Sequence, residues 1–256
     1  MRLVRFEQQG RTGYGVLREE KVFPVWETPF AGISETGETL SLGDVSLLAP
    51  CEPSKIVALG LNYRDHAAEF GGQVPDEPLI FLKPSTAVIG PEADILYPRM
   101  SRRVDYEAEL GVVLGKTARR VSEDAALDYI LGYTCVNDVT ARDLQKKDGQ
   151  FTRAKGFDTF APLGPWIETE IPDPDNLMVE AYLNGELRQH ASTSTMVFGV
   201  RRLIAFISQV MTLLPGDVIA TGTPAGIGPM RPGDVVEVRV EGIGALRNLV
   251  VAEEGI

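Results

Sequence analysis

One short stretch constrains the fold of this chain more than any other, because acidic and apolar residues alternate along it. From Val104 to Val112 the even positions are mostly apolar, and the odd positions include Asp105, Glu107 and Glu109. A period of two predicts a β-strand over 104–112 with one face on a core. Acids are poor strand formers, and like charges two residues apart on one face repel each other. The acidic face therefore needs an explanation.

Two explanations fit the acidic face. In the first, the face looks into water, as in many half-buried strands. In the second, Glu107 and Glu109 point at one divalent cation, whose charge removes their mutual repulsion. The second explanation needs a third oxygen ligand. Asp138 follows the apolar run Tyr129–Val136, a place where enzymes of many folds put a ligand. An aspartate in that place is also a common turn or cap residue.

The length and the punctuation of the chain predict two units. The 256 residues are enough for one large domain, or for one domain with a small N-terminal appendage. Residues 1 to 48 contain short apolar runs separated by Gly, Glu and Lys, which is typical of short strands joined by turns. The chain changes character around the proline-rich segment Ala49–Pro53. We predict a small β domain over 1–50 and a larger domain over 51–256.

Composition and charge exclude several classes of partner. The formal net charge of −11 argues against nucleic acid and anionic membranes as partners. The start of the chain has no apolar stretch suited to a signal peptide, and the segment Leu203–Leu214 is too short to span a bilayer. Cys51 and Cys135 form neither a disulfide framework nor a Cys-x-x-Cys pair. We therefore expect a protein of the reducing cytoplasm.

A short helix with a histidine is predicted over Asn62–Phe70. Asn62 is a good N-cap residue, and His66 and Glu69 lie three residues apart on one helix face. The glycines at 71 and 72 end the helix, and a short helix followed by a Gly/Pro loop is typical of a lid. The alternative is a surface histidine paired with a surface glutamate.

Further polar candidates lie in the second half of the chain. A helix predicted over Thr140–Lys147 places Arg142 and Gln145 on one face, near the aspartate that ends the apolar run. Lys155, beside a glycine, could reach an anionic substrate or remain solvated like most lysines. The Thr-Gly-Thr-Pro loop that contains Thr223 could bind an oxyanion, although Gly/Pro turns are usually only turns.

The order and spacing of these motifs resemble the fumarylacetoacetate hydrolase family over about residues 50 to 250. The motifs that carry the resemblance are Gly60–Glu69, Phe81–Ser85, Tyr106–Leu110, Asn137–Asp143, Ala154–Gly156, Asn184–Glu186 and Thr221–Pro224. The resemblance implies an α+β, mainly β fold. Its core would be a mixed β-sandwich roll, with a small N-terminal β appendage and a short lid helix. It also implies that 51–256 is a catalytic domain and that the protein is a homodimer.

By position, the resemblance implies that Glu107, Glu109 and Asp138 hold one Mg²⁺ or Mn²⁺ ion. The chemistry agrees, because three carboxylates without histidine or cysteine suit a hard, octahedral cation. The sequence departs from the family at one place. The animal hydrolase that gives the family its name has a fourth metal carboxylate seven residues before its catalytic histidine, and that position is Leu59 here. The shorter bacterial-type members therefore fit this chain better.

The resemblance also implies roles for the remaining candidates. Glu69 would orient His66, which would move a proton or activate water, and Lys155 would complete the catalytic group by neutralising substrate charge. Oxygen atoms of the substrate would be held by Arg142, Gln145 and Thr223.

The implied activity is that of an enzyme on small 2-oxo or 2-hydroxy-enoic dicarboxylic acids, through an enolate stabilised by the metal. We favour isomerisation of 2-hydroxyhepta-2,4-diene-1,7-dioate or decarboxylation of its oxo-tricarboxylate precursor in aromatic catabolism. Acylpyruvate hydrolase and oxaloacetate decarboxylase or tautomerase are the alternatives. An inactive dicarboxylate-binding protein is an alternative of another class, and three clustered acids without a cation argue against it.

Overall fold

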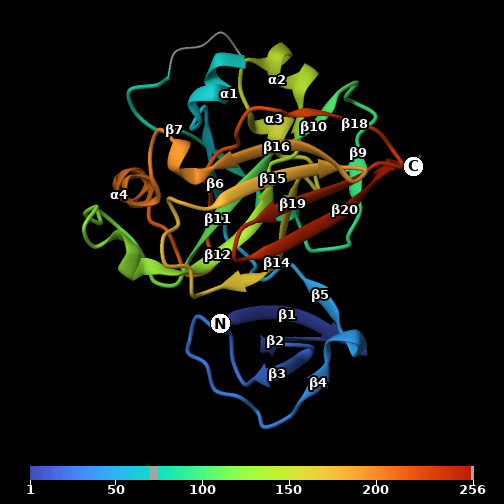
Figure 1. The fold of residues 1–256 in the computed structure, drawn as a ribbon, viewed down its shortest axis with the longest axis vertical. Coiled ribbons are helices and arrows are strands. Elements are labelled where there is room, and N and C mark those ends of the chain that lie inside the picture. The colour runs from blue at the N-terminus through green and yellow to red at the C-terminus, as the bar shows by residue number, and fades with distance from the viewer. Residues whose placement is uncertain (70–73, 255–256) are drawn as a thin grey trace.

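The computed structural model describes residues 1–69 and 74–254, and most of its regular structure is β-strand (Figure 1). The predicted α+β, mainly β class is confirmed, with three sheets and four short α-helices in the described residues. The glycines at 71 and 72, where we expected the first helix to end, lie outside these residues. No helix in the described ranges is long and apolar enough to cross a membrane.

The largest sheet has twelve strands. Its main path runs in the order β4 (Leu40–Ser41), β3 (Lys21–Val25), β2 (Arg11–Arg18), β1 (Arg2–Gln8), β14 (Ala161–Glu168), β12 (Ile130–Asn137), β11 (Ala108–Leu114), β17 (Val218–Ala220), β6 (Ile56–Gly60) and β7 (Leu79–Lys83). Two short strands lie off this path, β5 (Ser46–Leu48) beside β1 and β8 (Val88–Ile89) beside β14. Strands β6, β11, β12, β14 and β17 are buried over most of their length, and their apolar sequences suit strands that are covered on both faces.

The N-terminal strands form a small β unit that continues the large sheet. Strands β1 to β4 lie apart from the rest of the molecule, at the lower end in Figure 1. β1 nevertheless pairs with β14, with Arg2 opposite Glu168 and Leu3 opposite Ile167. The N-terminal ammonium of Met1 also donates to Glu168 Oε1 at 2.6 Å. The division of the chain into two domains stays a prediction.

The two smaller sheets complete the sandwich. The five-stranded sheet has the order β16 (Glu186–Ser192), β15 (Met178–Leu183), β19 (Val235–Val240), β20 (Gly244–Ala252) and β9 (Ile95–Tyr97). The three-stranded sheet has the order β13 (Thr140–Ala141), β10 (Val104–Tyr106) and β18 (Gly228–Met230). Side chains of β11 and β12 share one buried apolar core with those of β15 and β19. This core holds the large and five-stranded sheets together.

The acidic stretch is not the continuous strand that we predicted over 104–112. It forms β10 up to Tyr106 and β11 from Ala108, so the break falls at Glu107. β10 pairs with β13 and β18, whereas β11 pairs with β12 and β17. The chain therefore changes sheets at Glu107, whose backbone N–H donates to the side-chain Oδ1 of Asn137 at 3.0 Å rather than to a backbone carbonyl of a neighbouring strand.

All three acids of the stretch are buried. Asp105 and Glu109 are 0% exposed and Glu107 is 4% exposed. The explanation that the acidic face looks into water is therefore wrong. Buried carboxylates are costly unless each is paired with a cation or hydrogen-bonded, so the fold must supply partners for them.

Three short helices, α1 (Arg64–Glu69), α2 (Arg142–Asp148) and α3 (Thr152–Lys155), lie at the end of the sandwich near β10 (Figure 1). The longer α4 (Val200–Val210) packs its apolar face on the core. Residues 1–69 and 74–254 also include four 3-10 turns: η1 (Leu42–Asp44), η2 (Ser85–Ala87), η3 (Ala126–Tyr129) and η4 (Thr193–Thr195).

We predicted that Asn62 is the N-cap of this helix. The prediction is wrong, because α1 begins only at Arg64. The Asn62 side chain is fully buried and donates to the carbonyl oxygens of Phe198 at 3.1 Å and Thr221 at 2.7 Å. Asn62 therefore connects the segment just before α1 to two distant segments instead of capping the helix.

Candidate metal centre and active-site cavity

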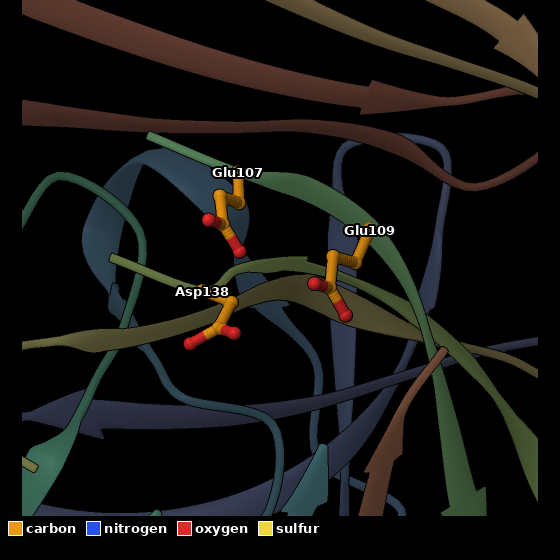
Figure 2. Close-up of side chains that lie close together, drawn as sticks. All are labelled: Glu107, Glu109 and Asp138. Atoms are coloured by element: carbon orange, nitrogen blue, oxygen red, sulfur yellow. The ribbon is translucent and has the colours of Figure 1, made fainter. Parts of the chain in front are cut away.

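Three buried carboxylates meet where β11 begins and β12 ends. Antiparallel pairing places Ala108 opposite Asn137. The adjacent Asp138 donates its backbone N–H to the carbonyl oxygen of Glu107 at 2.9 Å. Glu107, Glu109 and Asp138 each offer one oxygen, and these oxygens lie within 4.8 Å of one another. Figure 2 shows the three side chains close together. The strand register thus unites the three residues predicted as metal ligands.

Two of the three carboxylates are ion-paired. Lys155 Nζ lies 2.7 Å from Glu107 Oε2 and 2.5 Å from Asp138 Oδ2. The other oxygen of Glu107 accepts from Arg142, and the other oxygen of Asp138 accepts from Lys83. Burial acts to raise the pKa of Glu107. The charges of Lys155 and Arg142 outweigh burial and hold this pKa well below its ordinary value.

Glu109 has no cationic partner of this kind. Its Oε2 accepts from the backbone N–H of Gly222 at 2.8 Å, whereas its Oε1 is buried without a hydrogen-bond partner among the described residues. Burial raises the pKa of Glu109 well above its ordinary value, and the charges of Asp138 and Glu107 raise it further. A buried polar atom without a partner costs about 1–3 kcal/mol, and more when it is charged. A cation beside Oε1 would remove this cost.

The cluster fits a hard divalent cation. Each donor is a carboxylate oxygen, and the group contains neither histidine nor cysteine. Such a donor set suits Mg²⁺ or Mn²⁺ better than the softer metals that thiolate and imidazole ligands select. The orphaned Oε1 of Glu109 is the structural reason to expect an ion at this place.

His66 and Glu69 form a second pair, on helix α1. His66 Nδ1 lies 3.1 Å from Glu69 Oε2, and the other oxygen of Glu69 accepts from the backbone N–H of Gly226 at 2.9 Å. Because an ionised carboxylate only accepts, Nδ1 carries the proton, and Nε2 is the basic nitrogen of the neutral ring. His66 is 6% exposed and lines the same cavity as Glu107. It is therefore not the surface histidine of the alternative interpretation.

Arg142 is held in place by neighbouring side chains. Its Nε donates to Asp105 Oδ2 at 3.0 Å, and its Nη1 donates to Gln145 Oε1 at 2.6 Å. Asp105 also accepts from Arg103 Nε at 2.9 Å. Asp105, the acid of the alternating stretch that lies outside the carboxylate cluster, therefore binds and orients Arg142. Arg142 and Gln145 both line the cavity, next to Glu107.

Thr223 lies in the cavity wall, but its hydroxyl group is already engaged. Oγ1 donates to the carbonyl oxygen of Ala108 at 2.9 Å and accepts from Gln189 Nε2 at 2.8 Å. Gln189 in turn accepts from the backbone N–H of Ala108 at 2.9 Å. Thr223 thus fixes the backbone between Glu107 and Glu109, and its role in substrate binding stays a prediction.

The cavity at the carboxylates has a volume of about 230 Å³. Its polar lining consists of His66, Glu107, Arg142, Gln145, Lys155 and Thr223. Its apolar lining consists of Leu59, Gly60, Leu61, Phe81 and Phe151. The space can therefore receive the anionic head of a small acid together with an apolar tail.

Comparison with known families agrees with the motifs and the geometry. Residues 55–251 match the family model described as fumarylacetoacetate (FAA) hydrolase C-terminal. The chain belongs to the fumarylacetoacetate hydrolase family. Residues 1–50 match a second model, described as Rv2993c-like, N-terminal.

Relatives in the family include named enzymes. An uncharacterized protein of Archaeoglobus fulgidus is 59% identical over 215 residues, which cover 84% of this chain and 86% of that protein. The mitochondrial oxaloacetate tautomerase of Xenopus laevis is 44% identical over 237 residues, covering 88% and 74%. The crystal structure of 2-hydroxyhepta-2,4-diene-1,7-dioate isomerase from Mycobacterium marinum has a TM-score of 0.92 and 45% identity, and each chain covers 100% of the other.

Leu59 marks where this member departs from the animal hydrolase of the family. It is 3% exposed on β6 and lines the cavity. A leucine at this position supplies no oxygen to an ion, so the carboxylate group of the described residues stays at three. The departure also places apolar surface beside the polar residues of the cavity.

Lys83 is a further residue at the carboxylate cluster, and we did not predict this place for it from the sequence. It ends β7, is 0% exposed, and donates to Asp138 and to the carbonyl oxygen of Val139 at 3.2 Å. Burial lowers the pKa of Lys83, and the charge of Asp138 opposes that effect. The only signal in the sequence was a lysine directly after the apolar run Leu79–Leu82. A lysine that merely begins a turn after a strand gives the same pattern, so the sequence could not distinguish the two cases.

Proposed function

We propose that this family member is a divalent-metal-dependent enzyme that acts on small 2-oxo or 2-hydroxy-enoic acids. The reaction we put first is isomerisation of 2-hydroxyhepta-2,4-diene-1,7-dioate or decarboxylation of its oxo-tricarboxylate precursor. The observation that carries the proposal is the buried Glu109 oxygen without a partner, in a three-carboxylate cluster beside a small cavity.

Glu107, Glu109 and Asp138 would hold Mg²⁺ or Mn²⁺. When bound, the ion would supply positive charge that stabilises the negative charge developing on a substrate keto oxygen. Arg142 and Lys155 line the cavity and provide the cations for a substrate carboxylate. Because its Nε is already bound to Asp105, the guanidinium of Arg142 is oriented before the substrate arrives.

His66 is the proposed proton-transfer residue. Its hydrogen bond to Glu69 fixes the ring and leaves Nε2 as the base that takes a proton from the carbon next to the ketone. In a hydrolytic reaction the same nitrogen would take a proton from water. Glu69 is itself held by the backbone N–H of Gly226, so the ring has a rigid support.

A specific observation favours a second candidate function, oxaloacetate tautomerisation or decarboxylation, or acylpyruvate hydrolysis. The cavity of about 230 Å³ holds about eight water-sized groups. Oxaloacetate and acetylpyruvate are smaller than the hepta-diene-dioate and fit this space more readily. The Xenopus relative is named for oxaloacetate, whereas the Mycobacterium marinum structure is named for the hepta-diene-dioate. The two names support different candidates.

Product analysis with Mn²⁺ tests the proposal. The purified protein is given the hepta-diene-dioate, its oxo-tricarboxylate precursor, oxaloacetate and acetylpyruvate in separate reactions, each with an EDTA control. Metal-dependent turnover of the first two supports the first candidate. Selective reaction of oxaloacetate or acetylpyruvate supports the second. Turnover that survives complete chelation would contradict the metal requirement.

The same preparation tests the alternative of a protein without activity. If no substrate reacts and oxalate still binds tightly in the presence of Mn²⁺, the protein is a dicarboxylate-binding member without activity.

The assembly is a separate question. A homodimer is the assembly we propose by analogy with the family, and light scattering at several protein concentrations would distinguish it from a monomer.

A further inference from the structure

Two aromatic rings separate the active-site cavity from a larger groove. The groove has a volume of about 790 Å³ and runs beside the edge strand β7. Phe81 and Phe151 line both the cavity and the groove, and no other residue in the described ranges lines both. Their ring centroids lie 5.1 Å apart with an angle of 86° between the ring planes, which is an edge-to-face contact.

This aromatic pair is anchored on both sides. Phe81 lies on β7 opposite Ala58 of β6, and its ring centroid is 5.1 Å from Lys155 Nζ. Phe151 packs over Gly60, where a Cβ atom would lie only 3.5 Å from the Phe151 ring. The pair therefore connects the reacting end of the cavity with the backbone of β6, and both rings are held in defined positions.

The cavity leaves little room for a substrate tail on the near side of the rings. The head of a 2-oxo acid has two carboxylate oxygens, a keto oxygen and two carbons. The cavity holds about eight water-sized groups, and the head occupies about five of them. Space for about three carbons therefore remains for the tail. Leu59 and Leu61 supply apolar contacts for such a tail. A longer tail meets Phe81 and Phe151, behind which lies the empty space of the groove.

We propose that Phe81 and Phe151 form the wall that limits the tail length of the substrate. The proposal rests on the proposed 2-oxo acid function and favours its second candidate, because the hepta-diene-dioate carries a five-carbon tail. It names these two rings as specificity-determining residues. A tail of about three carbons lies against the apolar lining and gains about fourfold in affinity for each buried methylene. Removing the Phe151 ring joins the cavity to the groove and admits longer tails.

The test is the binding of a homologous series of straight-chain 2-oxo acids, from pyruvate to 2-oxodecanoate, to the Mn²⁺-loaded protein by calorimetry. In the unmodified protein we expect affinity to rise up to 2-oxopentanoate and to fall about tenfold at 2-oxooctanoate. In Phe151→Ala we expect 2-oxooctanoate to bind at least as tightly as 2-oxopentanoate. Phe151→Leu keeps part of the wall and should give an intermediate profile if the alanine variant folds poorly.

Leu79→Ala is the matched control. Leu79 is 42% exposed and lines the groove without lining the cavity, so its removal should leave the length profile unchanged. The proposal is overturned if Phe151→Ala and Phe151→Leu keep the profile of the unmodified protein, or if Leu79→Ala shifts it equally. If the unmodified protein binds none of the acids, the proposed function itself fails, which is a different result.

Discussion

Glu107 lies at the break just before β11 and Glu109 is the second residue of that strand, yet the protein surrounds the two carboxylates in opposite ways. Both are nearly inaccessible to solvent, and both belong to the three-carboxylate cluster. The oxygens of Glu107 accept from Lys155 and Arg142, and these charges hold its pKa low against the effect of burial. Glu109 accepts one backbone hydrogen bond, and burial together with neighbouring carboxylates holds its pKa high.

The difference shows which part of the cluster requires an ion. A buried acid with two cationic partners, like Glu107, forms an internal salt bridge, so its charge is neutralised without a metal ion. A buried acid whose neighbours are acids, like Glu109, is stable only when a proton or a cation joins it. Metal dependence should therefore be concentrated at Glu109, whereas Glu107 should also matter for the protein without metal.

The largest effect is expected for Glu109→Gln. The amide keeps the shape of the side chain but removes one of the three ligand charges. Replacing a group that only supports a ligand costs about 10- to 100-fold in metal affinity, so losing a ligand should weaken Mn²⁺ binding by at least about 100-fold. Metal-dependent turnover should be lost while the fold is retained. Mn²⁺ titration followed by electron paramagnetic resonance, with circular dichroism, measures both.

Glu180→Gln is the control for this variant, because Glu180 pairs with the exposed His190 outside the cavity. It should bind Mn²⁺ like the unmodified protein. Turnover of the Glu109→Gln variant at the original rate would refute the assignment of Glu109 as a metal ligand.

A smaller effect is expected for His66→Ala, which separates proton transfer from ion binding. General acid–base catalysis contributes about 10²- to 10⁴-fold, and turnover should fall by that factor. Binding of Mn²⁺ and of oxalate should change by less than about threefold, because His66 belongs to neither the carboxylate group nor the cationic residues. Steady-state kinetics and oxalate calorimetry on the same protein measure the two effects.

The chain provides a second His–Glu pair as the control for this experiment. His190 Nδ1 lies 2.9 Å from Glu180 Oε1, but its side chain is 54% exposed. His190→Ala should leave turnover unchanged. If His66→Ala lost oxalate binding as much as turnover, His66 would be a binding or structural residue instead of the proton-transfer residue.

The three-carboxylate cluster could be predicted because the sequence patterns that indicate it are local. The period of two along 104–112 and the aspartate at the end of an apolar run can be recognised without tertiary information. The family resemblance then joined Asp138 to Glu107 and Glu109, and the strand register accounts for their proximity. The mainly β class was predictable for the same reason, because apolar runs bounded by turns are local patterns.

Other features depend on contacts that have no local signature. The strand breaks at Glu107 because the chain passes there from one sheet to another. The alternation of apolar and acidic residues continues across this point, so the sequence gives no sign of the break. Asn62 looked like a helix cap, but partners more than 130 residues away take its side chain. Lys83 looked like the start of a turn, and only the tertiary structure places its ammonium group on Asp138.

The smallest effect we expect is a change in how stability depends on pH in the metal-free protein. The folded pKa of Glu109 is raised above its unfolded value. Its contribution to stability is therefore full below the unfolded pKa, about 4.3, and is lost as the pH rises through the folded pKa. The folded pKa of Glu107 is lowered, so its contribution is present above the unfolded pKa and is lost as the pH falls.

Urea unfolding in EDTA between about pH 4.5 and pH 8 distinguishes the two residues, because only Glu109 should make stability depend on pH in this range. Relative to the unmodified protein, Glu109→Gln should become more stable as the pH rises, by up to about 1.4 kcal/mol for each pH unit between the two pKa values of Glu109. Glu107→Gln should be less stable than the unmodified protein by a nearly constant amount over this range, because the contribution of Glu107 is already complete above its unfolded pKa. Saturating Mn²⁺ should cancel the advantage of Glu109→Gln, because the ion replaces the proton that Glu109 otherwise needs. Parallel pH profiles for the two variants would show that Glu107 and Glu109 share one environment, and the contrast between them would be wrong.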